Sequence, residues 1–202
     1  VLCITVSPRF SSTHHSARIA VQEVSKDRPE TRIELLDSES AAGGEGLIAL
    51  EALKLARNNL SLDDVMAAAS AVVRQVSLVA YLDTLYYVWK GGRVPQIAYW
   101  GTSLLKIKPV FELNHGQVER IARPRTASRA SETMLKFMRN RCINTSHLHA
   151  TVMHADAEEE ANRLREKIAS EFICEELFIS EFSPVMGTHT GPGMLGIAFW
   201  NE

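Results

Sequence analysis

The alternation of short apolar runs with amphipathic segments at the start of the chain constrains its fold more than any other feature. Residues 1–6 and 32–36 are short and rich in aliphatic side chains, as buried strands are. Each run leads through a polar or glycine-containing turn into a segment of helical periodicity, at residues 13–26 and 47–58. The order strand, helix, strand, helix predicts parallel strands with covering helices.

Helix caps and apolar stripes extend this prediction. The first helix is expected to carry Ile19 and Val24 on its inner face. Ser61 precedes two aspartates, a pattern that caps the N-terminus of a helix. A strand pattern returns at residues 76–82, and the glycine pair at 91–92 is expected to end a short helix.

The pattern changes in the second half of the chain. Two extended runs, 104–113 and 117–122, flank Asn114-His115-Gly116, which is a hairpin signal. The remaining elements are expected to be helices at 126–141 and 157–169, strands at 147–153, 174–182 and 194–200, and a loop at 183–193. We therefore predict an α/β chain in which residues 1–77 are the remainder of a doubly wound α/β N-terminal domain. Residues 78–202 would be an α+β C-terminal domain with a mainly antiparallel sheet.

No stretch predicts a membrane-spanning helix, because residues 66–82 are interrupted by Arg74 and Gln75 and fall short of the roughly 20 apolar residues required. The chain starts within an apolar run without Met, charged leader or cleavage site, which argues against a signal peptide and indicates a fragment. The cysteines are Cys3, Cys142 and Cys174. They lack C-x-x-C spacing, so we expect buried thiols that stay reduced in a cytoplasmic protein.

Basic residues are concentrated in one part of the chain. Residues 90–141 contain eleven Lys or Arg against three Glu, although the net charge of the whole chain is -2. A basic face of this kind can bind nucleic acid, an acidic protein or a phosphate-bearing ligand. A solvated face without a partner would have the same composition.

Hydroxyl side chains gather where the first strand should meet the first helix, at Ser11, Ser12 and Thr13. Backbone N–H groups and the helix dipole favour an anion at such a junction, and hydroxyls add donors for a carboxylate or phosphate. The glycine patterns of phosphate loops and dinucleotide sites are absent, so a nucleotide is not indicated. Simple helix capping is the alternative explanation.

A second candidate is the segment GTHTGPG, residues 187–193, in which three glycines and a proline surround His189. Such a segment holds an unusual backbone path, and its imidazole can donate to a carboxylate. A structural turn with an incidental histidine is the alternative. Arg93 and Arg125 each lie near a turn and would suit bidentate recognition of a carboxylate or phosphate.

Neither a metal site nor a catalytic nucleophile is predicted. His147 and His149 alternate along a predicted strand that His154 follows, without a matching carboxylate or third ligand nearby. No serine occupies a G-x-S-x-G pattern.

Five segments together resemble the DegV family of bacterial fatty-acid-binding proteins, which includes the lipid-carrying subunits of fatty acid kinases. They are SPRFSSTHHSA, LDTLYYVWKGGRV, SLLKIKPVFELNHGQV, PRTASRA and GTHTGPGMLGIAF, of which the last is the most specific. The resemblance runs along essentially the whole chain. It implies a DegV-like two-domain architecture with one long-chain fatty acid in a tunnel between the domains.

The resemblance also implies roles for the candidate residues. The fatty-acid carboxylate would be held by Ser11, Ser12, Thr13 and His189. The residues at the carboxylate end, or at the surface where a partner docks, would be Arg93, Arg125, Thr188 and Thr190. The partner would be an ATP-binding kinase subunit that phosphorylates the acid. The chain itself would be a carrier without a cofactor and not an enzyme, and the role would allow transient contact with a membrane surface.

The sequence departs from the family pattern in two respects. Ser12 stands where the family usually has glycine, and the sequence begins after the family's N-terminal segment with its Asp-Ser and Thr-Ser motifs. A nucleic-acid-binding or regulatory protein is the alternative function, although Tyr99 and Trp100 form no recognisable nucleic-acid motif and we expect no such partner. A kinase acting alone would need a phosphate loop or paired metal-binding carboxylates, and neither pattern is present.

Overall fold

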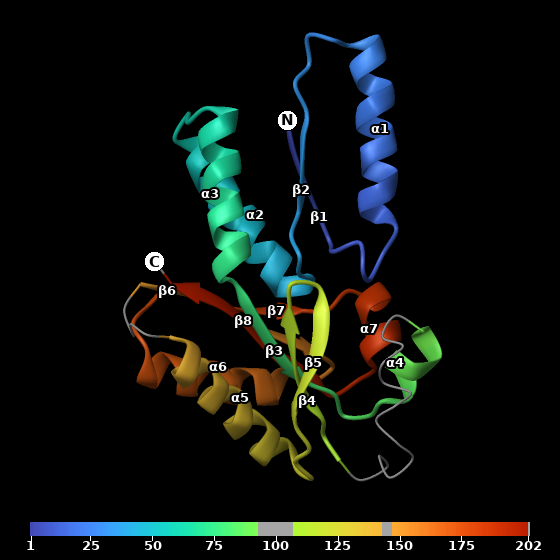
Figure 1. Cartoon of the computed structure of the whole chain (residues 1–202). Coiled ribbons are helices and arrows are strands. Elements are labelled where there is room, and N and C mark those ends of the chain that lie inside the picture. The colour runs from blue at the N-terminus through green and yellow to red at the C-terminus, as the bar shows by residue number, and fades with distance from the viewer. Residues whose placement is uncertain (93–106, 143–146, 202) are drawn as a thin grey trace.

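The computed structural model describes residues 1–92, 107–142 and 147–201, which form two sheets with surrounding helices (Figure 1). The strands are β1 (Leu2–Thr5), β2 (Glu34–Asp37), β3 (Ser77–Tyr81), β4 (Val110–Asn114), β5 (Gln117–Ala122), β6 (Leu148–Ala155), β7 (Cys174–Glu181) and β8 (Met194–Asn201). The helices are α1 (Thr13–Asp27), α2 (Ala42–Arg57), α3 (Leu62–Gln75), α4 (Tyr86–Gly91), α5 (Ala127–Arg141), α6 (Glu158–Glu171) and α7 (Pro184–Thr190).

The strand directions agree with the prediction from sequence. β1 and β2 form a small parallel sheet, and the larger sheet has the order β5-β4-β3-β8-β6-β7. Within the larger sheet the described pairs are antiparallel except β6 with β7, and β4 and β5 form the expected hairpin. The α/β fold with a mainly antiparallel sheet is confirmed. The domain boundary between residues 77 and 78 stays a prediction.

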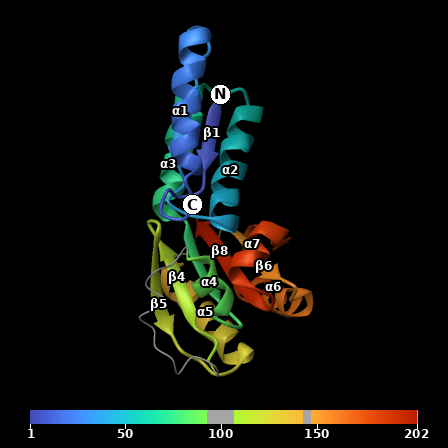
Figure 2. The ribbon, with the colours of Figure 1, turned by 90° about the vertical axis from the view of Figure 1, so that its right-hand side faces the viewer.

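Helices cover both faces of the larger sheet, because apolar side chains leave it in both directions. In β3, Leu78 and Ala80 belong to one core, whereas Val79 and Tyr81 belong to the other. α2 and α3 stand on the first face, and α5 and α6 cover the second (Figure 1). Figure 2 shows β1, α1 and most of α2 and α3 rising from one side of this sheet.

The first turn of α2 lies close to the larger sheet because it consists largely of glycine. A Cβ atom on Gly43 would fall 2.5 Å from Cγ2 of Thr151 on β6, and one on Gly44 would fall 2.1 Å from Oγ of Ser40. Both distances are shorter than real Cβ contacts. The glycine-broken start of this helix therefore allows α2 to pack directly on β6.

Two predictions from sequence are wrong in detail. Ile19 and Val24 are 47% and 38% exposed, because α1 contributes no residue to either core of the described structure. The segment 183–193 is not a loop throughout, because α7 lies within it. Pro184 suits a first helical turn, and Gly191, with φ of 76°, ends the helix. The sequence did not predict α7 because Gly187 lies inside it and glycine is a poor helix former.

A charged cluster connects α2 with the edge of the larger sheet. Nζ of Lys54 lies 3.0 Å from Oε1 of Glu176 on β7, and Nδ1 of His149 lies 3.2 Å from the other oxygen of that carboxylate. The ring of His149 is buried and stacks on Trp200, with 4.4 Å between the centroids. Burial by itself would raise the pKa of Glu176, but the hydrogen bonds with Lys54 and His149 outweigh it and the pKa is lowered.

We expect Glu176→Gln to lower the free energy of unfolding by about 1 kcal/mol at pH 7, a value limited by solvent screening at Lys54. A carboxylate with a lowered folded-state pKa stabilises the fold above its unfolded pKa, about 4.3. That contribution is lost as the pH falls through the folded-state pKa. Urea unfolding followed by circular dichroism should therefore show a gap between variant and wild type that closes in acid.

Glu181→Gln is the matched control, because Glu181 is an exposed glutamate on the same strand. This variant should unfold like the wild type at pH 7 and in acid. A gap for Glu176→Gln that persisted below about pH 3 would contradict the assignment of the stabilisation to the ionised carboxylate.

Candidate functional site

The predicted hydroxyl cluster lies where the chain passes from β1 into α1. Ser12 is the N-cap residue of α1 and Thr13 is its first helical residue. The hydroxyl oxygens of Ser11 and Thr13 are 2.7 Å apart, and Ser11 Oγ accepts a hydrogen bond from Thr13 N at 3.2 Å. Ser12 makes no side-chain capping bond, whereas Ser61 caps α3 by accepting one from Asp64 N. Helix capping therefore does not account for all three hydroxyls.

The turn of the β4–β5 hairpin holds the loops that follow β1 and β2. His115 Nδ1 makes a short contact with the Glu39 carboxylate, and Gly116 N donates to Glu39 O at 2.7 Å. A Cβ atom on Gly116 would fall 2.6 Å from Oγ of Ser7. Ser7 N donates in turn to Ser40 O at 2.9 Å. The carboxyl ends of the two parallel strands, where α/β sheets usually bind ligands, are thus held against the larger sheet.

The GTHTGPG segment packs tightly against α4. A Cβ atom on Gly191 would lie 2.2 Å from Cδ2 of Tyr87, so a side chain at this position would overlap the tyrosine ring. On α4 itself, a Cβ atom on Gly91 would lie 2.9 Å from Nδ1 of His189. Two motifs that are far apart in the sequence are therefore in contact, and His189 lies beside the end of α4.

The threonines that flank His189 use their hydroxyl protons within α7. Thr188 Oγ1 donates to Val185 O at 2.7 Å, and Thr190 Oγ1 donates to Met186 O at 3.1 Å. A hydroxyl has one proton, so in this arrangement neither threonine side chain offers a donor to an anion. Their assignment to the carboxylate end or to a docking surface stays a prediction.

Arg125 is exposed and lies between β5 and α5. Lys108 N donates to the carbonyl of Pro124, the residue before Arg125, at 2.7 Å, and the ammonium of Lys108 pairs with Asp83. A Cβ atom on Gly193 would fall 2.8 Å from Cβ of Asp83. The segment that carries Arg125 is thus connected to the glycine-rich segment. Arg93 lies outside the described residues.

The candidate residues fall into two sets. One set, with His189 and its flanking threonines, lies at α4 and α7, and the other, residues 11–13, lies at the start of α1. In Figure 1 the loop before α1 ends near α7, whereas the turned view of Figure 2 separates them. Among the described residues no hydrogen bond joins the two sets. Their joint binding of one ligand stays a prediction.

Sequence reasoning did not identify Tyr87 and Gly91 as residues that shape the surroundings of His189. The signal that could have found them is their membership of the LDTLYYVWKGGRV segment. Local patterns do not show a contact between α4 and α7, because they report preferences of one segment at a time.

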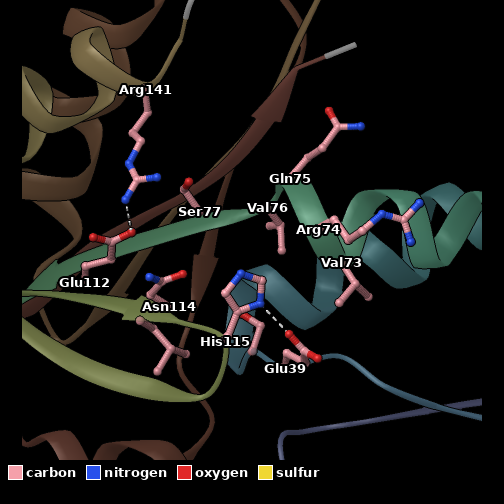
Figure 3. Close-up of a pocket in the computed structure, with 12 residues that line it drawn as sticks. Glu39, Val73, Arg74, Gln75, Val76, Ser77, Glu112, Asn114, His115 and Arg141 are labelled. Atoms are coloured by element: carbon pink, nitrogen blue, oxygen red, sulfur yellow. Dashed lines mark hydrogen bonds and ion pairs between the residues drawn. The ribbon is translucent and has the colours of Figure 1, made fainter.

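A polar hollow lies elsewhere, beside the ends of β3, β4, α3 and α5 (Figure 3). Arg141 Nη2 lies 2.7 Å from Oε1 of Glu112 on its wall, and the contact between His115 and Glu39 closes another side. None of the predicted ligand-binding residues lines this hollow. Its polar lining also differs from what an acyl chain requires.

Several cations of the basic segment are paired with acids in the described structure. The pairs are Arg139 with Glu132 and Glu171, Arg141 with Glu112, and Lys108 with Asp83. Tyr99 and Trp100 lie outside the described residues. Cations already paired within the protein contribute less to binding the phosphate backbone of a nucleic acid, so this arrangement argues against a nucleic-acid-binding surface.

Other chemistry finds little support in the described part of the chain. It contains no group of three or more His, Cys, Asp or Glu that could hold a metal ion, and His147 Nδ1 instead pairs with Glu175 at 2.7 Å. Burial raises the pKa of the Cys142 thiol to about 11 and also raises that of Cys174, so both stay protonated at neutral pH. No described helix has the length and apolar character that crossing a bilayer requires.

Comparison with known proteins identifies relatives along the whole chain. A family model described as an uncharacterised protein of the DegV family matches residues 1–202. A DegV domain-containing protein of Clostridium acetobutylicum is 33% identical over 202 residues, which are 100% of this chain and 70% of that protein.

Solved structures give the same result. A DegV family protein from Thermus thermophilus, described by its fatty acid binding, is 30% identical with a TM-score of 0.90 and is matched over 100% of this chain and 71% of its own. A Thermotoga maritima protein whose structure reveals a fatty acid binding function is 25% identical with a TM-score of 0.87, over 100% and 69%. The match along the entire sequence, together with these relatives, shows that the chain belongs to the DegV family.

Proposed function

We propose that this protein binds a long-chain fatty acid and holds its carboxylate between the start of α1 and the α4–α7 pair. The observation that carries the proposal is the likeness to the Thermus thermophilus protein, which is described by its fatty acid binding and matches the whole chain with a TM-score of 0.90. The Thermotoga maritima relative is likewise described by a fatty acid binding function. Hydroxyls at the α1 junction and an imidazole at α7 provide the chemistry that a carboxylate needs.

The two ends of a fatty acid need different surroundings. About fifteen methylenes at ~0.8 kcal/mol each contribute on the order of 10 kcal/mol of gross burial, which offsets the cost of association. A carboxylate that leaves water must gain several hydrogen bonds. On one side the donors are the backbone N–H of Ser12 and the hydroxyl of Ser11, which keeps its own proton for the carboxylate when it accepts that of Thr13 Oγ1. On the other side the donor is His189, because the protons of Thr188 and Thr190 are used within α7.

The protein acts in this proposal as a carrier in the cytoplasm and not as an enzyme. It presents the carboxylate to an ATP-binding kinase subunit, where a carboxylate oxygen attacks the γ-phosphorus of ATP, ADP leaves and an acyl phosphate forms. Arg125 is exposed and lies on a segment connected to the glycine-rich segment, so it would meet the partner or the transferred phosphoryl group. Arg93 is assigned the same role by resemblance. Contact with a membrane surface would be transient and would supply the acid.

We expect the protein purified from a bacterial host to carry about one fatty acid per chain, seen by native mass spectrometry and identified after solvent extraction. Ser11→Ala and His189→Ala should each weaken binding of a fluorescent polyene fatty acid by about tenfold or more, because each removes a hydrogen bond to a charged group. Ser25→Ala, at the far end of α1, is the matched control and should bind like the wild type. A wild-type chain that carried no fatty acid and bound none of the added polyene fatty acid would refute the proposal.

Presentation to a kinase makes a separate prediction. With the kinase subunit and ATP, trapping by hydroxylamine should detect acyl phosphate, and the chain alone should form none. Arg125→Ala should lower the rate by about tenfold, because a charge that meets the partner or phosphoryl group is lost, while fatty-acid affinity changes little. Arg57→Ala, an exposed arginine at the end of α2, should leave both unchanged. Equal rates for Arg125→Ala and wild type would remove Arg125 from this role.

A further inference from the structure

One edge of the His189 ring, the edge that carries Nδ1, lies against Gly91, the last residue of α4. The ring atoms nearest to an ideal Cβ position on Gly91 are Nδ1 at 2.9 Å, Cε1 at 3.8 Å and Cγ at 3.9 Å. Nδ1 therefore faces the α4 backbone, and Nε2 lies on the opposite side of the ring. We propose that Gly91 is a positioning residue that keeps the Nδ1 edge of His189 against α4 and directs Nε2 toward the fatty-acid carboxylate. This inference rests on the proposed function and extends it to a residue that does not touch the ligand.

The backbone around His189 has little freedom to move away from α4. Gly191 lies against Tyr87, where an added Cβ atom would be 2.2 Å from the ring. Gly191 N donates to Gly187 O at 2.8 Å, which closes the end of α7. Gly193 N donates to Ala155 O at 2.7 Å, which attaches the following residues to β6. The imidazole is therefore the group that yields if volume is added at position 91.

A methyl group at position 91 would displace the ring by a functionally relevant amount. A Cβ atom placed 2.9 Å from Nδ1 is closer than ordinary van der Waals contact, which begins at 3.4 Å. The ring must shift by about 0.5 Å or rotate, and a binding group must hold its position within about that distance. A misdirected Nε2 weakens a hydrogen bond steeply. The loss would fall on the carboxylate and not on the acyl chain.

Gly91→Ala tests this inference, with Gly187→Ala as its matched control. Both residues are helical glycines without a positive φ, so alanine strains neither backbone. Gly187 lies two positions before His189 on α7, and a Cβ atom there would meet nothing within 4 Å. The two variants add the same methyl group, one against the imidazole and one in open space.

The first measurement needs no ligand. In ¹⁵N-histidine-labelled protein, the His189 ring resonances, assigned from their absence in His189→Gln, should shift in Gly91→Ala and stay in place in Gly187→Ala. If Gly91→Ala fails to fold, Tyr87→Ala is the second variant. It removes the ring that holds Gly191 in place, and we expect it to shift the His189 signals as well. Unshifted signals in folded Gly91→Ala, or in Tyr87→Ala where it alone folds, would overturn the inference.

The second measurement compares palmitate with hexadecan-1-ol, which has the same chain length but no carboxylate. Gly91→Ala should weaken palmitate binding about tenfold and change binding of the alcohol little, which a general packing defect would not do. Adding Gly91→Ala to His189→Ala should cause no further loss. Wild-type protein that bound no palmitate would count against the proposed function, and the ring signals would still decide the role of Gly91. Palmitate binding that depended on His189 but not on Gly91 would overturn the inference alone.

Discussion

Burial of the larger sheet on both faces determines where the rest of the chain can lie. α2 and α3 occupy one face and α5 and α6 the other, so α4 and α7 are left at the ends of strands. α4 follows β3 and α7 precedes β8, and these strands are antiparallel neighbours in which Tyr81 pairs with Leu195. The end of β3 therefore meets the start of β8. Strand register, more than any attraction between the two helices, brings the LDTLYYVWKGGRV and GTHTGPG segments together.

The small parallel sheet contributes the other half of the candidate site in a similar way. The carboxyl ends of β1 and β2 carry the loops of Ser11 and Ser40, and the hairpin turn at Gly116 contacts both loops. A ligand group at this edge would meet the backbone N–H groups and hydroxyls at the start of α1, which favour an anion. A fatty-acid carboxylate fits this chemistry, and the long apolar chain adds the larger share of binding energy.

Glycine acts in this protein mainly by allowing close approach. Gly43 admits Thr151, Gly116 admits Ser7, and Gly191 admits the ring of Tyr87, each at a distance that a Cβ atom would prevent. These contacts join segments that are distant in sequence, so each glycine contributes to tertiary packing, and Gly116 and Gly191 also adopt the positive φ of their turns. The contact of Gly91 with His189 has the same character, but it involves a side chain with chemistry of its own.

The sequence by itself determined the succession of elements apart from α7, the parallel β1–β2 pair, the β4–β5 hairpin and membership of the DegV family. Periods of 3.6 and 2 residues and turn motifs report local backbone preferences, and these decide where helices, strands and hairpins form. Tertiary structure alone decided that residues 184–190 form a helix despite Gly187 and that Ile19 and Val24 stay exposed. It also decided that the hydroxyls of Thr188 and Thr190 donate to carbonyl groups within α7. Contacts between distant segments follow from strand register and from which atoms are already hydrogen-bonded, and no local pattern records either.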